Sequence, residues 1–221
     1  DLEEFSQSLT DKTFLVCVML VNNETGVIQP VDKVVSITKE KGIPVFTDAT
    51  QAVGKMKVDV CYLGVDYLCL SAHKINGPKG VGALYLKNPD SLEPLIHGGS
   101  QEKSKRGGTY NVPGIVGLGK ASEIALRELD SRILFYKKKK EKVLAEVIGA
   151  DGVENFQDSP KVENIISLTL IDEENEEYLS KQRNKFSAST GSACTAEIVQ
   201  DSHVLRVIPG IEPKKVVRIS V

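Results

Sequence analysis

Apolar strand-like runs alternate with helical periodicity along the first half of the chain. Residues 13–20 form a continuous apolar run of strand length, and residues 31–41 carry apolar side chains at helical spacing. Further strand-like runs occur at residues 44–46, 66–70 and 81–85. Strands that alternate with helices are typical of crossover connections and of a mostly parallel sheet. The pattern therefore predicts an α/β fold for this half.

The second half of the chain has a more helical pattern. Residues 112–147 predict one long connecting helix, because apolar side chains recur there at helical spacing. After this helix, the sequence predicts a strand at 165–170, a helix at 174–185 and a strand that is still under way at Val221. We expect a large domain over residues 1–125, followed over residues 126–221 by the helix and a smaller α+β domain.

Composition and charge exclude several classes of function. The chain has 221 residues, and its 28 basic and 30 acidic side chains give a formal net charge of −2. This balance excludes a chain-wide basic surface for nucleic acid. No apolar run approaches the roughly 20 residues of a membrane-spanning helix. We therefore expect a soluble intracellular protein with no nucleic-acid or membrane partner, and we interpret the basic run at residues 137–142 as a solvated helix face.

The four cysteines are Cys17, Cys61, Cys69 and Cys194. They show no CxxC or Cys/His spacing, so the sequence predicts no metal site, and they are too sparse for a disulfide framework. Cys17 and Cys69 lie in strand runs and are expected to be inert core residues. Cys194 lies in a loop of small residues over 187–196 that cannot pack a core, so its thiol is expected to be accessible.

Two predicted strands end in side chains that can carry out chemistry. Asp48 follows the run at 44–46, and Ser71, His73 and Lys74 follow the run at 66–70. Ligands bind at the carboxyl edge of such sheets, so these side chains are expected to converge. A lysine in this position can supply an amine for a Schiff base, although it can also simply reach solvent. With Asp48 as partner of a pyridine nitrogen, Lys74 meets the requirements of pyridoxal phosphate.

Five short motifs follow one another along the chain. They are Asn22-Asn23-Glu24-Thr25-Gly26, Asp48-Ala49-Thr50-Gln51, Ser71-Ala72-His73-Lys74, Gly77-Pro78-Lys79-Gly80 and Gly191-Ser192-Ala193-Cys194-Thr195. In this order they resemble the motifs of the NifS/IscS-type cysteine desulfurases of the class V aminotransferase family, to which selenocysteine lyase is closely related. The resemblance is dense over 13–123 and 186–221 and weak over 130–185. It implies part of the fold type I of pyridoxal-phosphate-dependent transferases.

The resemblance implies a cofactor role for five residues of the large domain. Lys74 resembles the lysine that binds pyridoxal 5'-phosphate as a Schiff base, and Asp48 resembles the partner of the pyridine nitrogen. Gln51 resembles the hydrogen-bond donor to the phenolate oxygen of the cofactor. Ser71 and His73 resemble phosphate ligands, for which a hydroxyl and an imidazole are suitable donors.

The resemblance also implies the substrate and the reaction. Asn23 resembles a ligand of both cofactor and substrate, and Arg218 resembles the arginine that binds the substrate α-carboxylate, for which a guanidinium fork is well matched. Cys194 resembles the nucleophile that takes the sulfur of L-cysteine as a persulfide and leaves L-alanine. The implied use of this sulfur is iron–sulfur cluster assembly or another transfer through an acceptor or scaffold protein.

Thr109 follows a glycine-rich segment that resembles a loop reaching across a dimer interface to the partner's phosphate. The resemblance therefore implies a homodimer. Interpreted from the residues alone, the same segment is an ordinary glycine-rich surface loop.

Three alternatives to a cysteine desulfurase stay open. Selenocysteine lyase is the nearest, although the residues around Cys194 favour the desulfurase. A non-catalytic homologue would act as a binding module, and a redox protein would use the Cys194 thiol alone. Compared with the family, the chain is expected to be shortened at both ends. Its compartment is expected to be the cytoplasm or the mitochondrion.

Overall fold

The computed structural model describes residues 1–148, 151–182, 188–190 and 202–221. The chain forms two compact units. The first consists of Asp1–Leu20 and Gln29–Leu129, and the second of Val21–Ile28 and Asp130–Val221. The predicted nucleophile Cys194 lies outside the described residues.

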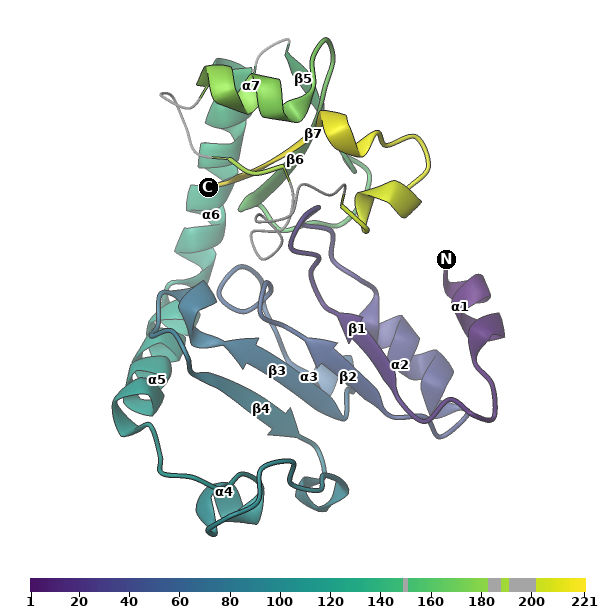
Figure 1. The fold of residues 1–221 in the computed structure, drawn as a ribbon, viewed down its shortest axis with the longest axis vertical. Helices are drawn as coiled ribbons and strands as arrows, with labels where there is room; N and C mark the ends of the chain where they lie inside the picture. The colour runs from purple at the N-terminus through teal and green to yellow at the C-terminus, as the bar shows by residue number, and fades with distance from the viewer. Residues whose placement is uncertain (149–150, 183–187, 191–201) are drawn as a thin grey trace. The chain divides into compact units, whose positions relative to one another are not determined.

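The first unit is built on a four-stranded sheet. Its strands lie side by side in chain order (Figure 1): β1 (Val16–Met19), β2 (Val45–Asp48), β3 (Tyr67–Ser71) and β4 (Gly82–Leu86). The first three strands are parallel, and β4 pairs with β3 in the antiparallel direction. The predicted α/β fold with a mostly parallel sheet is confirmed.

Helices connect and flank these strands. They are α1 (Leu2–Ser8), α2 (Val31–Lys39), α3 (Val60–Leu63), α4 (Gln101–Ser104), α5 (Val112–Arg127) and the 3-10 turns η1 (Ala72–Ile75) and η2 (Pro89–Ser91). The local sequence explains their ends. Asp59 begins α3, because its carboxylate accepts hydrogen bonds from the N–H groups of Cys61 and Tyr62, and Gly64 ends it with a φ of 71°.

The two faces of this sheet are buried to different degrees. Val45, Thr47 and Leu68 are buried on one face, whereas Cys17 and Asp48 are exposed on the other. The prediction that Cys17 is a core residue is therefore wrong. A continuous apolar run indicates burial on both faces of a strand, but neighbouring residues point to opposite faces, and only one face is covered among the described residues.

The predicted long helix is divided at Glu128. Helix α5 ends at Arg127, and Glu128 has φ and ψ of −100° and 6° with its N–H directed to the carbonyls of Ile124 and Leu126. A new helix, α6 (Leu129–Lys142), then begins and continues into the π-helical turn η3 (Val143–Ile148). The apolar periodicity continues through Glu128, so the sequence pattern does not indicate the break between the two helices. No helix in the described part of the chain is long and apolar enough to span a bilayer.

The second unit contains a three-stranded antiparallel sheet. Its order is β5 (Gly152–Glu154), β6 (Ile165–Leu170) and β7 (Val216–Ser220), with α7 (Asn175–Gln182) and the turns η5 (Leu205–Val207) and η6 (Pro213–Lys215). Its core joins the two longer strands to α7 through Ile166, Leu168, Leu170, Tyr178, Val217 and Ile219. Asn175 stabilises the start of α7, because its amide donates to the carbonyls of Pro213 and Val216 at 3.1 and 3.0 Å.

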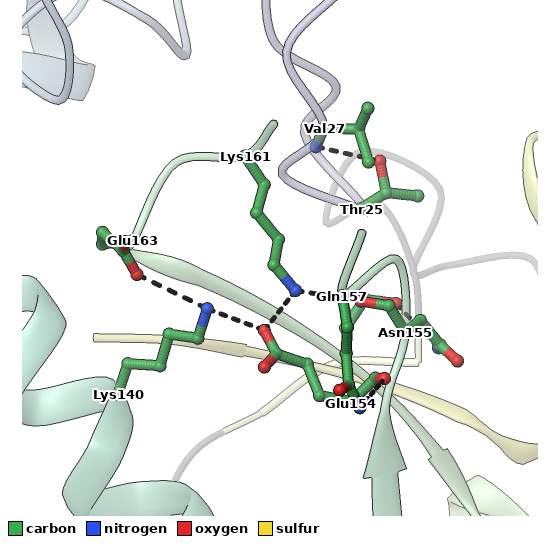
Figure 2. A network of polar contacts seen from close by, with 9 residues as sticks. Thr25, Val27, Lys140, Glu154, Asn155, Gln157, Lys161 and Glu163 are labelled. Atoms are coloured by element: carbon green, nitrogen blue, oxygen red, sulfur yellow. Dashed lines mark hydrogen bonds and ion pairs between the residues drawn. The ribbon is translucent and has the colours of Figure 1, made fainter. Parts of the chain in front are cut away.

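A cluster of four charged side chains links α6 to β5 and to residues 161–163 (Figure 2). Glu154 Oε1 lies 2.8 Å from Lys140 Nζ and 2.6 Å from Lys161 Nζ, and Glu163 Oε2 lies 3.4 Å from Lys140. The side chains of Lys140, Glu154 and Lys161 are only 12%, 13% and 10% exposed. The interpretation of the basic run at 137–142 as a solvated face is thus wrong for Lys140. Its acidic partners, Glu154 and Glu163, lie outside the helix, so the helical pattern does not indicate them.

Candidate active site

Polar side chains of the first unit meet at one edge of its sheet. Asp48 is the last residue of β2 and Ser71 is the last residue of β3, and these neighbouring strands are parallel. The turn η1 follows β3 directly and carries His73 and Lys74. Because the carboxyl ends of parallel strands lie at the same edge, the topology brings these four side chains together. Gln51 lies half-buried in the turn after Asp48.

The burial pattern of η1 determines the orientation of Lys74. Ala72 and Ile75 of η1 are buried, whereas His73 and Lys74 are exposed. Ile75 packs against α5 in a small core with Ala121 and Ala125. The turn is thereby fixed to a helix, and the lysine side chain is directed away from the core.

The residues around η1 restrict it further. Asn76 ends the turn with a φ of 63°, and the side-chain ammonium group of Lys55 donates a hydrogen bond to the carbonyl of Lys74. Gly77 lies so close to its neighbours that an added Cβ would be 2.9 Å from Ala72 Cβ and 3.1 Å from Ala121 Cβ. Only glycine fits there, which allows η1 to pack tightly on α5.

Hydrogen bonds and strand pairing fix the position of Asp48. Its Oδ1 accepts a hydrogen bond from Thr50 N at 2.8 Å, and the neighbouring Ala49 N donates to the carbonyl of Cys69 at 2.9 Å. Cys69 is the residue of β3 directly opposite Asp48. Burial, together with the charge and the hydrogen-bond acceptance of Asp48, raises the pKa of the Cys69 thiol to about 11.

Ser71 and His73 form a pair beside Lys74. The Ser71 hydroxyl oxygen lies 2.7 Å from His73 Nδ1. When the hydroxyl donates this hydrogen bond, the proton of the neutral imidazole is on Nε2 and can be donated to an oxyanion. The pair therefore supplies a hydrogen-bond donor of the kind that binds phosphate.

The predicted substrate residues Asn23 and Arg218 belong to the second unit. Arg218 lies on β7, and its Nη1 donates to the carbonyl of Asn23 at 3.2 Å. The backbone of Arg218 also exchanges two hydrogen bonds with Ser189, at 2.7 and 3.0 Å. Arg218 therefore joins the Asn23 loop to the short segment that precedes residues 191–201.

The loop that carries Asn23 has a defined local structure. The side-chain oxygen of Asn22 accepts hydrogen bonds from the N–H groups of Glu24 and Thr25, both at 2.9 Å. Gly26 has a φ of 73°, and its carbonyl accepts a hydrogen bond from Val162 N at 2.9 Å. The side-chain turn and the pairing with Val162 of the same unit fix the position of this loop.

Two predicted residues are not placed against the others. Thr109 is exposed between α4 and α5 of the first unit. Cys194 lies outside the described residues. Two residues with contacts to the site were missed, namely Cys69 beside Asp48 and Ser189 beside Arg218. Both residues reach the site through pairing between backbone segments. The position of Cys69 could have been inferred only by placing the ends of the two predicted strands side by side.

The donors at the sheet edge of the first unit fit pyridoxal phosphate. Lys74 offers an exposed ammonium group, and among the described residues no hydrogen bond or ion pair engages it. Asp48 offers an exposed carboxylate at the end of the neighbouring strand. Ser71 and His73 add hydrogen-bonding groups suitable for a phosphate. An amine, a carboxylate and phosphate donors are the set that this cofactor requires.

The sequence is similar to curated cysteine desulfurases. It is 40% identical over 205 residues to the cysteine desulfurase IscS of Methanosarcina thermophila, covering 92% of this chain and 51% of the relative. It is 42% identical over 211 residues to the cysteine desulfurase IscS of Dictyoglomus turgidum, covering 94% of this chain and 54% of the relative. The chain thus spans about half the length of the curated relatives it matches.

The fold is similar to solved structures of related proteins. A structure titled "NIFS-LIKE PROTEIN" matches with a TM-score of 0.85 and 34% identity, covering 100% of this chain and 59% of the other. A structure titled "SspA in complex with cysteine" matches with a TM-score of 0.83 and 33% identity, covering 100% of this chain and 62% of the other. The resemblance to NifS/IscS-type proteins and to fold type I is confirmed.

The model of the family described as "Aminotransferase class-V" matches residues 1–221. Since this match extends over the whole chain, the protein belongs to the class-V aminotransferase family.

Proposed function

We propose that this protein acts as a pyridoxal-phosphate-dependent cysteine desulfurase, which converts L-cysteine to L-alanine and takes the sulfur onto Cys194. The main structural support is the position of Asp48 at the end of β2 and of Lys74 in the turn directly after the neighbouring strand β3. The relatives named cysteine desulfurase and the structure of SspA in complex with cysteine support the choice of substrate.

Each residue at the sheet edge has a separate role toward the cofactor. When bound, pyridoxal phosphate supplies an electron sink for negative charge that develops on the substrate carbon atoms. Lys74 holds the cofactor and moves a proton at the substrate. Asp48 keeps the proton on the pyridine nitrogen. Ser71 and His73 bind the phosphate, and Gln51 donates to the phenolate oxygen.

The sulfur transfer balances without a further reactant. The Cys194 thiolate attacks the sulfur of the bound cysteine, so that a sulfur–sulfur bond forms and the carbon–sulfur bond breaks. The electron pair of that bond stays with the carbon and takes up a proton, which gives alanine. Cys194 is left as a persulfide for a sulfur acceptor or scaffold protein, as in iron–sulfur cluster assembly.

The protein would act as a homodimer inside the cell. In a homodimer, Thr109 would bind the phosphate of the partner's cofactor. The protein would work in the cytoplasm or the mitochondrion. L-selenocysteine is the second candidate substrate, because the same residues would bind it.

A spectroscopic and product assay tests the proposed function. Addition of pyridoxal phosphate to the purified protein should produce a visible absorption band, and L-cysteine should then yield L-alanine and a persulfide on Cys194 detectable by mass spectrometry. Alanine should form faster from L-cysteine than from L-selenocysteine. A clear preference for selenocysteine would identify a lyase, and the absence of both band and product would indicate a non-catalytic binding module.

Replacing Arg218 with lysine should weaken substrate binding. A lysine keeps the charge but loses the planar fork that can bind a carboxylate through two hydrogen bonds. The loss of one charge-assisted hydrogen bond should raise KM for L-cysteine roughly tenfold. Steady-state kinetics measures this effect, and kcat should change less than KM. Arg206→Lys, an exposed arginine on η5, is the matched control and should keep the wild-type KM. An unchanged KM in Arg218→Lys would contradict the assignment.

A further inference from the structure

Cys69 is the direct cross-strand neighbour of Asp48. The two residues are paired in the register of β2 and β3, and paired residues of neighbouring parallel strands point to the same face of the sheet. The hydrogen bond from Ala49 N to the carbonyl of Cys69, at 2.9 Å, fixes this register at the strand end. The side chains of Cys69 and Asp48 therefore lie on the same face of the sheet, on adjacent strands.

The environment of Cys69 keeps its thiol protonated. Burial and then the negative charge of Asp48 raise the pKa of this thiol to about 11, so the S–H group persists at neutral pH. A protonated thiol is a weak hydrogen-bond donor and a poor nucleophile. Cys69 is therefore suited to donate to a carboxylate, and it does not compete with Cys194 for sulfur.

Two groups flank the Asp48 carboxylate. Thr50 N donates to its Oδ1 from the turn that follows β2, at 2.8 Å. The thiol of Cys69 approaches from the neighbouring strand. Since the carboxylate is otherwise exposed, the N–H of Thr50 and the thiol of Cys69 are the two flanking groups suited to restrict its rotation before any ligand binds.

We infer that Cys69 is a positioning residue, whose thiol orients the Asp48 carboxylate toward the pyridine nitrogen of the cofactor. This inference rests on the proposed function, in which Asp48 binds that nitrogen. It also sets a chemical requirement for the position, because the side chain must be a small hydrogen-bond donor that stays uncharged. Serine meets this requirement and alanine does not.

Two variants of Cys69 test the role in the holoenzyme. Cys69→Ala should weaken the affinity for pyridoxal phosphate about three- to tenfold, the effect of losing one modest hydrogen bond, whereas Cys69→Ser should stay within about twofold of wild type. Fluorescence titration with pyridoxal phosphate measures both. Cys17→Ala is the matched control, because Cys17 is exposed on β1 and pairs with Phe46. Denaturant unfolding of each variant shows whether the fold is kept.

A second measurement needs no cofactor. In the cofactor-free protein, alkylation of Cys69 can be followed across pH by mass spectrometry of its peptide. The apparent pKa of Cys69 should fall in Asp48→Asn, because the negative charge is removed while the burial remains. Cys61, which is exposed on α3 in both proteins, serves as the internal reference for the alkylation reaction.

The outcomes separate this inference from the proposed function. An unchanged Cys69 titration in Asp48→Asn, or wild-type cofactor affinity in Cys69→Ala, would overturn the positioning role even if the wild type forms alanine. Equal losses in Cys69→Ala and Cys69→Ser would also overturn it, because they would indicate a packing role. Failure of the wild type to bind pyridoxal phosphate would instead overturn the proposed function. The titration of the Cys69 thiol would still show whether Asp48 acts on it.

Discussion

Replacing Lys74 with alanine should abolish covalent binding of pyridoxal phosphate and lower alanine formation by at least about 10³-fold. The loss is large because one side chain both holds the cofactor and moves a proton, and a positioned proton-transfer group alone contributes about 10²- to 10⁴-fold. Lys74 is exposed and Ile75 carries a buried side chain of η1, so truncation of Lys74 should leave the core around Ile75 intact.

Mass spectrometry measures the covalent bond directly. After reduction with borohydride, the wild-type protein should carry the pyridoxyl group on the peptide that contains Lys74, and Lys74→Ala should carry none. Lys57→Ala is the matched control, because Lys57 is also exposed in the first unit and has no assigned role. A pyridoxyl group on another lysine of the wild type would contradict the assignment, as would substantial alanine formation by Lys74→Ala.

Replacing Glu154 with alanine should destabilise the second unit by about 2 kcal/mol. The carboxylate contacts both Lys140 and Lys161, and its removal leaves two nearly buried ammonium groups without this partner. Removal of one member of a fully buried pair costs about 3–5 kcal/mol, and the partial exposure of this cluster lowers that figure. The remaining contacts, from Lys140 to Glu163 and from Lys161 to the carbonyl of Asn155, limit the loss.

The same carboxylate should make stability depend on acidic pH. Burial tends to raise the pKa of Glu154, but the hydrogen bonds and charges of Lys140 and Lys161 outweigh it and lower this pKa below its ordinary value of 4.5. A carboxyl group with a lowered pKa in the folded state stabilises the fold above its ordinary pKa. That contribution is lost as the pH falls from about 4.5 through the folded-state pKa.

Denaturant unfolding at neutral and acidic pH measures both effects. The difference in unfolding free energy between wild type and Glu154→Ala should be largest at neutral pH and shrink below pH 4.5. Glu177→Ala is the matched control, because Glu177 pairs with Lys181 on an exposed surface and should contribute little. A difference that stays constant with pH would show that the charge of Glu154 does not stabilise the fold.

The sequence predicted those parts of the fold that follow from local pattern. The run at 165–170 coincides with β6, and the helical spacing from Val31 coincides with α2. The short elements α3 and β5 were not predicted, because four and three residues are too few to establish a period. The prediction that Cys17 is buried was wrong for a related reason, because an apolar run does not indicate which face of a sheet is covered.

The candidate site was predictable where it depends on strand ends. Asp48 and Lys74 could be expected at one edge, because parallel strands bring their carboxyl ends together. The contact between Asp48 and Cys69 could not be predicted, because it depends on the register between strands, which no local pattern records. The hydrogen bonds between Ser189 and Arg218 join segments distant in sequence and were missed for the same reason.

The segment Val21–Ile28 has a consequence for the order of folding. It is synthesised between β1 and α2, yet it belongs to the unit whose other residues follow Leu129. The chain therefore passes between the units at three points, and the second unit is completed by pairing residues more than a hundred positions apart. Such non-local pairing slows folding. A fragment beginning at Asp130 would lack Gly26, whose carbonyl accepts a hydrogen bond from Val162 N, so the second unit is not a contiguous, separable module.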